Sequence, residues 1–483
     1  LSLMGRSALD RINNFTDFTR KTDSYTVAQG GSYSKTFNYG YEWNTDFLLN
    51  FNKSLTEKIS LDLNGGGNLR TSLFDQVSGA GVNFNVENIF ALGNTADPRP
   101  AESFSKKEVQ SLYGFGSIGF FNSIYLEFSG RNDWSSTLPA ANRSYFYPSF
   151  GVSAVLSDLL KLPNAISFLK LRGSWAEVGS DTDPYQLSRR AIVFNGTVSL
   201  NSTLPNADLL PETTQSTEVG LDARFFKNNL RLDLSYYKTN TFDQLFAISV
   251  PVASGINQRF LNGADIQNQG IEAVLGFTPI SNKNLTWDIN INFAKNNSKI
   301  LDLAEGLNEL NRGGPTGFIS DFVLRKGFPF GDIQSRGFQR DAQGRVIVGA
   351  NGLPLITAGK NVPIANFNPD WLGGINNQFN YKNFNFSFLI DIRQGGTITA
   401  FSEAILAGDG FLDYTLPGRE GGVVFGKDVF TNETAVKQDG TPNDIKASAE
   451  KFWNLVGGRN APTGEAFVRD ASNVRLREMV LGY

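Results

Sequence analysis

Residues 218–238, Glu218-Val-Gly-Leu-Asp-Ala-Arg-Phe-Phe-Lys-Asn-Asn-Leu-Arg-Leu-Asp-Leu-Ser-Tyr-Tyr-Lys238, alternate apolar and polar side chains on both sides of a short polar turn. Alternation with a period of two is typical of β-strands, and residues 227–229 carry a turn signal, so the sequence predicts a hairpin. A turn centred on residues 227–228 pairs Phe225 with Leu230 and places the apolar residues of both strands on one face. A slip by one residue would mismatch every pair.

The opposite face of this hairpin carries full charges along both strands, at Asp222, Arg224, Arg231 and Asp233. This is more charge than an ordinary solvent-exposed face needs. Repeated long hairpins that are apolar on one face and polar on the other are typical of a transmembrane β-barrel. In such a barrel lipid contacts the apolar face and a wet lumen contacts the polar face.

The composition agrees with a folded chain that has no membrane-spanning helix. Of 483 residues 40% are hydrophobic and 19% are charged, and the mean hydropathy is −0.22. These fractions are not those of a disordered chain. No uncharged apolar run approaches the roughly 18 residues that a membrane helix needs. Helical spans are therefore excluded, whereas a barrel is not, because its strands give a much weaker signal.

The residue types that are missing narrow the function further. The net charge of −3 argues against a nucleic-acid partner, since nucleic-acid binders usually carry a basic patch. The chain has no histidine and no cysteine, which removes Ser-His-Asp and Cys-His catalysis and histidine metal sites. An enzyme would need a carboxylate-only mechanism, and no acid/base pair stands out. We therefore expect no enzymatic activity. The absence of cysteine fits a cell-surface protein and a cytosolic one equally.

The same alternation recurs along the chain and predicts roughly fourteen strands. They cover residues 1–12, 39–51, 59–67, 111–121, 124–134, 144–157, 167–178, 218–225, 230–238, 270–277, 286–293, 375–381, 384–392 and 475–483. Long loops are expected at 13–35, 71–110, 179–213, 299–370 and 393–466. Two short helices are expected in loops, at about 303–310 and at 445–456, the second capped by Asp444 and ended by Gly457.

Short turns alternate regularly with long loops in this series. Outer-membrane barrels sort their connections in this way, with short periplasmic turns and long extracellular loops. No segment has the composition of a linker, so we expect one barrel domain over residues 1–483. The first and last segments are themselves predicted strands without a signal peptide or a closing turn. We therefore expect an internal part of a longer barrel.

Tryptophans mark the ends of several predicted strands, at Trp43, Trp134, Trp287 and Trp371. The favoured interpretation is the aromatic girdle that barrels place at the membrane interfaces. The alternative is stacking on a ligand, most obviously on a sugar ring. Trp134 and Trp371 adjoin predicted long loops, so they are the candidate substrate-binding residues.

Acidic residues on the predicted polar faces are expected to form a hydrated wall of salt bridges. They are Glu42, Asp46, Asp62, Glu127, Asp222, Asp233, Glu272, Asp288 and Asp391. Two other segments, Asp341-Ala-Gln-Gly344 and Gln438-Asp-Gly440, faintly resemble calcium loops. Neither completes an EF-hand pattern, and both are ordinary turn sequences. We expect no metal site and no cofactor.

Several short motifs resemble the SusC/RagA family of TonB-dependent outer-membrane transporters. They are Arg131-Asn-Asp-Trp-Ser-Ser136, Tyr147-Pro-Ser-Phe-Gly151, Leu169-Lys-Leu-Arg-Gly-Ser-Trp175, Leu210-Pro-Glu-Thr-Thr214 with Glu218-Val-Gly-Leu221, Asn268-Gln-Gly-Ile-Glu272, Asn368-Pro-Asp-Trp371 with Gly373-Gly374, Tyr381-Lys-Asn-Phe384, and Arg469-Asp-Ala-Ser-Asn-Val-Arg-Leu476 with Leu481-Gly-Tyr483. Each motif is weakly specific by itself. Their order and spacing are specific, and they cover nearly the whole chain.

This resemblance implies a barrel of about 22 strands that is filled by an N-terminal plug and lidded by a SusD-like surface lipoprotein. It implies import of a glycan or peptide across the outer membrane, driven by the TonB–ExbB–ExbD complex. This chain would supply the middle and later strands, while the plug, the TonB box and the final strands are absent from it. Of the two ligand classes, an oligosaccharide is expected before a peptide.

Two other functions remain open at this level. A passive porin-like channel needs the same barrel without a plug. A surface adhesin or another all-β binding protein would give a soluble product instead. That alternative would be excluded by a need for detergent and by heat-modifiable gel mobility.

Overall fold

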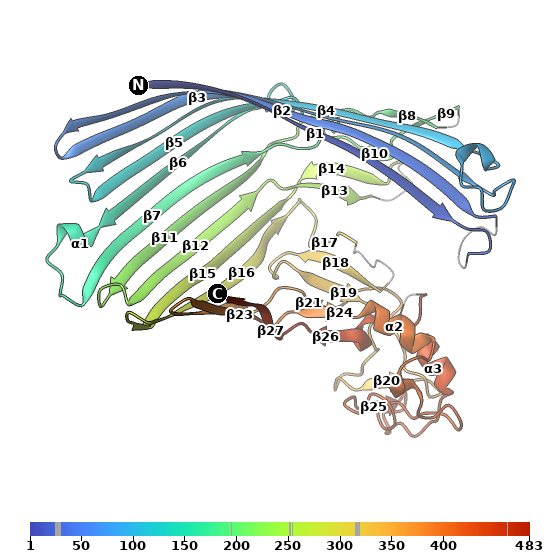
Figure 1. Ribbon diagram of the computed structural model, residues 1–483. Coiled ribbons are helices and arrows are strands. Elements are labelled where there is room, and N and C mark those ends of the chain that lie inside the picture. Colours follow the sequence, from blue (N-terminus) through green and yellow to red (C-terminus); the bar gives the residue numbers. More distant parts are fainter. Residues whose placement is uncertain (25–29, 195, 251–252, 254, 314–318, 461) are drawn as a thin grey trace. The chain divides into compact units, whose positions relative to one another are not determined.

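The computed structural model describes residues 1–24, 30–194, 196–250, 253, 255–313, 319–460 and 462–483. Across these residues, fourteen strands form one antiparallel sheet (Figure 1). In sheet order they are β1 (Ser2–Arg20), β2 (Ser32–Thr56), β3 (Ile59–Val82), β4 (Arg99–Phe120), β5 (Ile124–Ser135), β6 (Ser144–Val155), β7 (Ile166–Ser180), β11 (Glu212–Phe225), β12 (Leu230–Phe242), β15 (Ala264–Ser281), β16 (Leu285–Leu303), β22 (Trp371–Tyr381), β23 (Phe384–Gln394) and β27 (Asn473–Gly482).

The sheet order follows the chain order, and each predicted strand has a counterpart in the sheet. The predicted sorting of connections is also confirmed. Short turns of residues 57–58, 121–123, 226–229, 282–284 and 382–383 join the strands at one end of the sheet. The β6–β7 connection at this end is longer and contains the one-turn helix α1 (Leu156–Leu159). The connections at the other end are longer and hold the remaining small elements.

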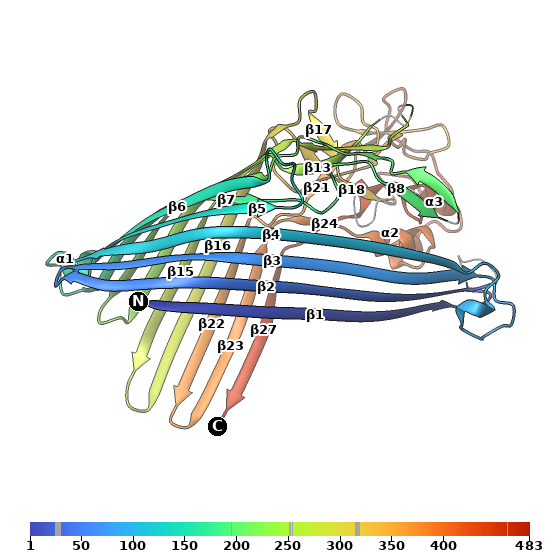
Figure 2. The same cartoon turned by 90° about the horizontal axis from the view of Figure 1, so that it is seen from above.

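The first four strands are much longer than the alternation predicts (Figure 2). The β1–β2 register runs unbroken from Ser2 opposite Asn50 to Arg20 opposite Ser32. The predicted loops at 13–35 and 71–110 are therefore wrong over much of their length. These extensions lack the clean apolar alternation of the predicted strands, although their backbone pairing continues. A periodicity criterion cannot detect such a strand.

The hairpin of residues 218–238 is present as β11 and β12. Its turn places Phe226, Lys227 and Asn228 at φ values of 52°, 57° and 71°. Two cross-strand hydroxyl pairs follow the predicted register, with Thr214 Oγ1 3.1 Å from Thr241 Oγ1 and Ser216 Oγ 3.0 Å from Thr239 Oγ1. In each pair the two residue numbers have the same sum as in the predicted pair of Phe225 and Leu230.

The chain divides into two compact units. The first contains residues 1–161, 170–219 and 239–264, and the second contains 162–169, 220–238 and 265–483. A single barrel domain over 1–483 stays a prediction. Besides its sheet strands the first unit holds β8 (Ala191–Phe194) paired with β9 (Thr197–Leu200), a small sheet of β10 (Thr203–Leu204), β14 (Gln258–Asn262) and β13 (Leu245–Ser249), and the 3-10 turn η1 (Leu92–Asn94).

The second unit carries a folded insert, which we name the loop module and define as the described residues of 304–370 and 395–472. It contains a sheet of β17 (Glu309–Asn311), β18 (Ser320–Arg325), β19 (Asp332–Ser335) and β21 (Val362–Asn366); the pairs β20 (Val346–Val348) with β25 (Ala435–Lys437) and β24 (Thr397–Thr399) with β26 (Val468–Asp470); the helices α2 (Phe401–Gly408) and α3 (Ala449–Val456); and the 3-10 turns η3 (Asp413–Thr415) and η4 (Gly464–Phe467).

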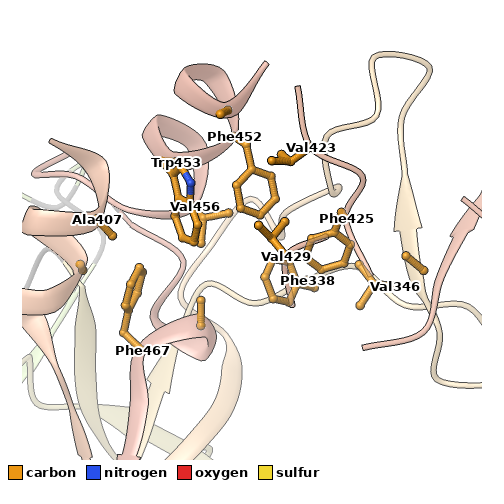
Figure 3. Close-up of a cluster of buried hydrophobic side chains, with 14 of the residues drawn as sticks. Phe338, Val346, Ala407, Val423, Phe425, Val429, Phe452, Trp453, Val456 and Phe467 are labelled. Atoms are coloured by element: carbon orange, nitrogen blue, oxygen red, sulfur yellow. The ribbon is translucent and has the colours of Figure 1, made fainter. Parts of the chain in front are cut away.

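A continuous hydrophobic core holds the loop module together (Figure 3). Phe338 comes from the first long excursion, and Phe425, Phe452 and Phe467 come from the second. The ring centroids of Phe338 and Phe425 are 5.2 Å apart, and those of Phe425 and Phe452 are 5.8 Å apart. Burial of these rings therefore joins two segments that are distant in the sequence.

The helix predictions were partly right. The helix expected at 303–310 is wrong, because residues 309–311 pair with β18 as β17. The helix expected at 445–456 forms as the shorter α3 and ends at Gly457 as predicted, but Ser448 caps it instead of Asp444. The Ser448 hydroxyl accepts a hydrogen bond from the Lys451 amide, which satisfies one of the first free N–H groups. Helix α2 was not predicted. No helix in the described part of the chain has the length and apolarity to cross a membrane.

Candidate functional site: a polar sheet face and a loop module

Ion pairs cover the polar face of the sheet in the first unit. Arg6 of β1 lies directly opposite Asp46 of β2, and their side chains are 2.8 Å apart. Arg70 of β3 reaches Glu42 at 2.7 Å. A cavity of about 510 Å³ opens on this face, lined by Arg6, Glu42, Asn44, Asp46, Asn68, Arg70, Tyr113 and Arg131. The surface is charged but largely neutralised within itself.

A second polar cluster lies at the loop end of β4 to β7. The Arg131 guanidinium donates to Asp133 at 2.7 Å, and the Tyr147 hydroxyl donates to the same carboxylate at 2.8 Å. Lys107 is 2.5 Å from Asp181, which also accepts a hydrogen bond from Ser135. Asp181 follows directly after β7, so these bonds fix the start of the long 181–211 connection against β4 and β5.

The second unit repeats this arrangement on its own strands. Arg231 Nη2 donates to both carboxylate oxygens of Asp288, at 2.9 and 2.8 Å, and Arg477 lies 2.8 Å from Asp391. A row of amides adjoins the first pair, because Asn290 lies opposite Asn376 and Asp288 lies opposite Gln378. The predicted wall of salt bridges is thus present for Glu42, Asp46, Asp222, Asp288 and Asp391.

The other face of the sheet is apolar and exposed. In the first unit Phe47 and Leu112 are 53% and 57% exposed, and the ring of Phe150 stacks on Trp175 at 6.4 Å. In the second unit Trp287 stacks on Phe379 at 5.3 Å. Soluble proteins rarely expose so large a contiguous apolar surface. This face therefore needs a hydrophobic environment.

The candidate tryptophans lie on the apolar face. Trp134 lies opposite Gln110, in the same cross-strand row as Leu69. Trp371 begins β22, and its ring is 5.8 Å from that of Phe293. Both positions fit an aromatic girdle, as do those of Trp43 and Trp287. Contact of Trp134 or Trp371 with an imported ligand stays a prediction.

Charged groups also brace the loop module. The Arg340 guanidinium bonds Glu433 at 2.8 Å and Glu465 at 2.6 Å. The hydrogen bonds to Glu433 and Glu465 and their negative charges raise the pKa of Arg340 above its ordinary value, so it stays protonated. These partners lie far from Arg340 in the sequence, so no local pattern predicts the ion pairs. No local pattern predicts the contacts of Asp181 either.

A third interaction of the loop module involves Tyr414. Its hydroxyl donates to Glu403 at 2.9 Å, and Glu403 is also paired with Arg469. Burial raises the pKa of the Tyr414 hydroxyl, and the hydrogen bond to the Glu403 carboxylate raises it further.

The segments that faintly resemble calcium loops are turns closed by their own hydrogen bonds. The Asp341 carboxylate accepts from the backbone N–H groups of Gln343 and Arg345 at 3.0 and 2.9 Å. The Asp439 carboxylate accepts from the Thr441 amide at 2.9 Å. Among the described residues no group of three or more His, Cys, Asp and Glu side chains is placed to hold a metal ion.

Known proteins share both the sequence pattern and the fold. The family model for the TonB dependent receptor-like β-barrel matches residues 4–331. TonB-dependent receptor P26 of Formosa agariphila is 25% identical over 505 residues, which covers 98% of this chain and 49% of that protein. TonB-dependent receptor SusC of Bacteroides thetaiotaomicron is 26% identical over 312 residues, covering 59% of this chain and 31% of that protein.

Among solved structures, that of the RagAB peptide transporter superposes with a TM-score of 0.76 at 20% identity, covering 99% of this chain and 53% of that chain. At this identity the likeness shows the fold. The chain spans about half the length, or less, of these three relatives.

Proposed function

The chain belongs to the TonB-dependent receptor β-barrel family, and on that premise we propose that it forms part of the wall and the ligand-collecting loops of a nutrient importer. The family is located in the outer membrane and is non-enzymatic. Lipid then covers the apolar face, and the polar face lines the lumen. The short turns lie on the periplasmic side, and the loop module lies outside the cell.

The observation that carries the proposal is the division of charge between the two faces of the sheet. Paired charges such as Arg6–Asp46 and Arg231–Asp288 lie on one face, while Phe47, Leu112 and their neighbours remain exposed on the other. A soluble binding protein would have no cover for the second face. An importer needs both faces, because a hydrated ligand must pass along the first while lipid seals the second.

For the ligand we propose an oligosaccharide before a peptide. The lumen wall of β16 and β22 presents neutral hydrogen-bonding groups, because Asn290 pairs with Asn376 and Thr286 pairs with Asn380. Asn385 donates to Asn380 at 2.6 Å in the same region. Amides both donate and accept hydrogen bonds, which suits a ligand rich in hydroxyl groups. Most neighbouring charges are already paired and offer little to peptide termini.

We further propose that the importer acts with a SusD-like surface lipoprotein and with the TonB–ExbB–ExbD complex. The lipoprotein would cover the extracellular loops, of which the loop module is the largest folded part. The name RagAB of the solved transporter with the same barrel fold denotes two components, which supports a partner protein for this chain. The contact with TonB would be made by the plug region of the whole protein.

Uptake by the full-length protein tests this function. A strain lacking the gene is complemented with the wild type or with a variant that carries Asn290→Leu and Asn376→Leu, and growth on oligosaccharides and on peptides is compared. We expect the wild type to restore TonB-dependent growth on an oligosaccharide and the variant to slow it, at unchanged protein level. TonB-dependent growth on peptides but not on oligosaccharides would exclude an oligosaccharide as the imported ligand.

The second candidate function is a passive porin-like channel. The same wall of paired charges would suit it, since any aqueous pore needs a polar lining. Uptake that persists in a strain without TonB, and ion conductance of the purified full-length protein in planar bilayers, would favour the channel. Stoichiometric co-purification of a surface lipoprotein in mild detergent would favour the lidded importer.

A further inference from the structure

A groove of about 1320 Å³ crosses the apolar face of β1 to β5 in the first unit. Two cross-strand rows line it. In the first row Gly5 lies opposite Phe47, and Phe47 lies opposite Gly67, which is followed by Leu112. The second row runs through Ser7, Thr45, Leu69, Gln110 and Trp134. Residues that face each other across an antiparallel pair project to the same side, so both rows lie on the lipid-facing side.

The first row forms an apolar trough. Among the described residues no atom lies within 4 Å of a side chain placed at Gly5, so these residues leave the space above it open. Phe47 leans over Gly67, and the exposed side chain of Leu112 closes the far wall. The trough is therefore narrow, open to the membrane and free of charge, which suits an acyl chain.

The second row lies at the level where the hydrocarbon of the bilayer ends. Leu69, Gln110 and Trp134 each lie ten residues from the strand end at a short periplasmic turn, at Ile59, Phe120 and Ile124. A tilted membrane strand crosses the hydrocarbon in about 9–11 residues. This row therefore meets the lipid headgroups of the outer leaflet.

The headgroup end of the groove carries one cation, one anion and one indole ring. Arg143 is exposed, and its guanidinium has no ion-pair partner within the described part of the chain. The Glu108 carboxylate accepts one hydrogen bond, from Gln110 at 3.0 Å, and can accept more. Arg6 and Asp46 also border the groove, but their side chains neutralise each other on the lumen face.

We propose that this groove binds one phosphorylated glycolipid of the outer leaflet. An acyl chain lies over Gly5 against the Phe47 ring, and a phosphate binds Arg143 through charge-assisted hydrogen bonds. The sugar ring stacks on Trp134, and its hydroxyls donate to Glu108. Neither a plain phospholipid, which lacks the sugar, nor free phosphate, which lacks the chain, would use all of these groups.

Native mass spectrometry of the full-length, delipidated protein tests the proposal. The protein is mixed with diphosphorylated lipid A, with dephosphorylated lipid A or with phosphatidylethanolamine, and the bound lipids are counted. We expect one lipid A per barrel and at least about tenfold weaker retention of the dephosphorylated form, the loss expected for a hydrogen-bonded charge. Equal retention of all three lipids would overturn the proposal.

Two matched glycine variants separate the groove from the rest of the lipid face. Gly5→Leu fills the trough, whereas Gly65→Leu adds the same side chain on the same face, also into open space, outside the groove. We expect the first to lose the retained lipid A and the second to keep it. Heat-modifiable gel mobility confirms that both are folded. Loss in both variants, or in neither, contradicts the assignment.

Charge variants keep the test decisive if Gly5→Leu does not fold. Arg143→Gln is expected to retain lipid A at least about tenfold more weakly, by the same reasoning about a charged hydrogen bond. Lys161→Gln removes an exposed cation elsewhere and is expected to have no effect. Trp134→Ala should weaken lipid A more than phosphatidylethanolamine. Unchanged retention in Arg143→Gln would exclude the phosphate contact.

Discussion

Arg231 of β12 and Asp288 of β16 are joined by two hydrogen bonds from a single guanidinium nitrogen, at 2.8 and 2.9 Å. Thr278 donates a third bond to the same carboxylate at 2.6 Å. The pair lies on the lumen face and is only partly exposed. It links two strands that the sheet separates by β15. The polar face is therefore braced across several strands and not only between neighbours.

We expect Asp288→Ala to lower the free energy of unfolding by about 1–2 kcal/mol, because the Arg231 guanidinium loses its carboxylate partner in a partly solvated site. Asp222→Ala is the control, since the ion pair of Asp222 with Arg224 is 3.5 Å long and lies within one strand. That change should cost no more than about 0.5 kcal/mol. Denaturant unfolding of the full-length protein in micelles measures both. Equal losses would show that the bracing has no effect.

The face assignment of β12 predicts opposite outcomes at two adjacent residues. Arg231 faces the lumen, so Leu232 projects into lipid. Leu232→Arg should cost about 2–4 kcal/mol of barrel stability, as expected for a cation in the hydrocarbon. Asp233→Asn, on the lumen face, should cost under about 1 kcal/mol. Similar losses in the same unfolding assay would refute the assignment.

We expect the loop module to unfold independently, while the barrel stays folded. Phe452 is fully buried between Phe425 and Trp453, so Phe452→Ala should cost about 3–5 kcal/mol locally. Phe411, which is 75% exposed, is the control, and Phe411→Ala should stay within about 0.5 kcal/mol. Hydrogen exchange at β20 and β25 in the full-length protein reports the change. Retained protection in Phe452→Ala would mean that the core does not hold the module.

Ionisation of the Tyr414 hydroxyl at alkaline pH is expected to reduce the stability of the loop module. Burial and the Glu403 carboxylate raise the pKa of its hydroxyl above the ordinary value of about 10. A raised pKa means that the contribution to stability is present below the pKa of the unfolded chain and is lost as the pH rises through the folded value. The tyrosinate absorbance difference between wild type and Tyr414→Phe should therefore titrate above pH 10. A midpoint at or below 10 contradicts this.

The predicted ligand contacts of the tryptophans can be tested by substitution. Trp371 lies on the apolar face beside Phe293, so we expect Trp371→Ala to reduce barrel stability and to change the affinity for an imported oligosaccharide by less than about twofold, under roughly 0.4 kcal/mol. Calorimetry with the full-length protein measures the affinity. A loss of affinity of about tenfold or more, roughly 1.4 kcal/mol, would instead support ligand contact.

Sequence periodicity determined the membrane part of this protein. Fourteen strands were predicted, fourteen form the described sheet, and the hairpin register at Phe225 and Leu230 follows from the alternation alone. The reason is that one face of each strand contacts lipid and the other contacts water. Apolar and polar residues therefore alternate along the strand. The lumen salt bridges follow for the same reason.

Tertiary structure alone decided what lies beyond the bilayer. Past Ile12 the chain lacks the clean alternation that lipid imposes, yet it continues as strand because β2 supplies a hydrogen-bonding partner. Residues 309–311 become a strand through pairing with β18, and Phe338 meets Phe452 only because two distant excursions share one core. The groove between Gly5 and Trp134 likewise needs five strands in register. Such contacts depend on residues far away in the sequence, so local sequence patterns do not predict them.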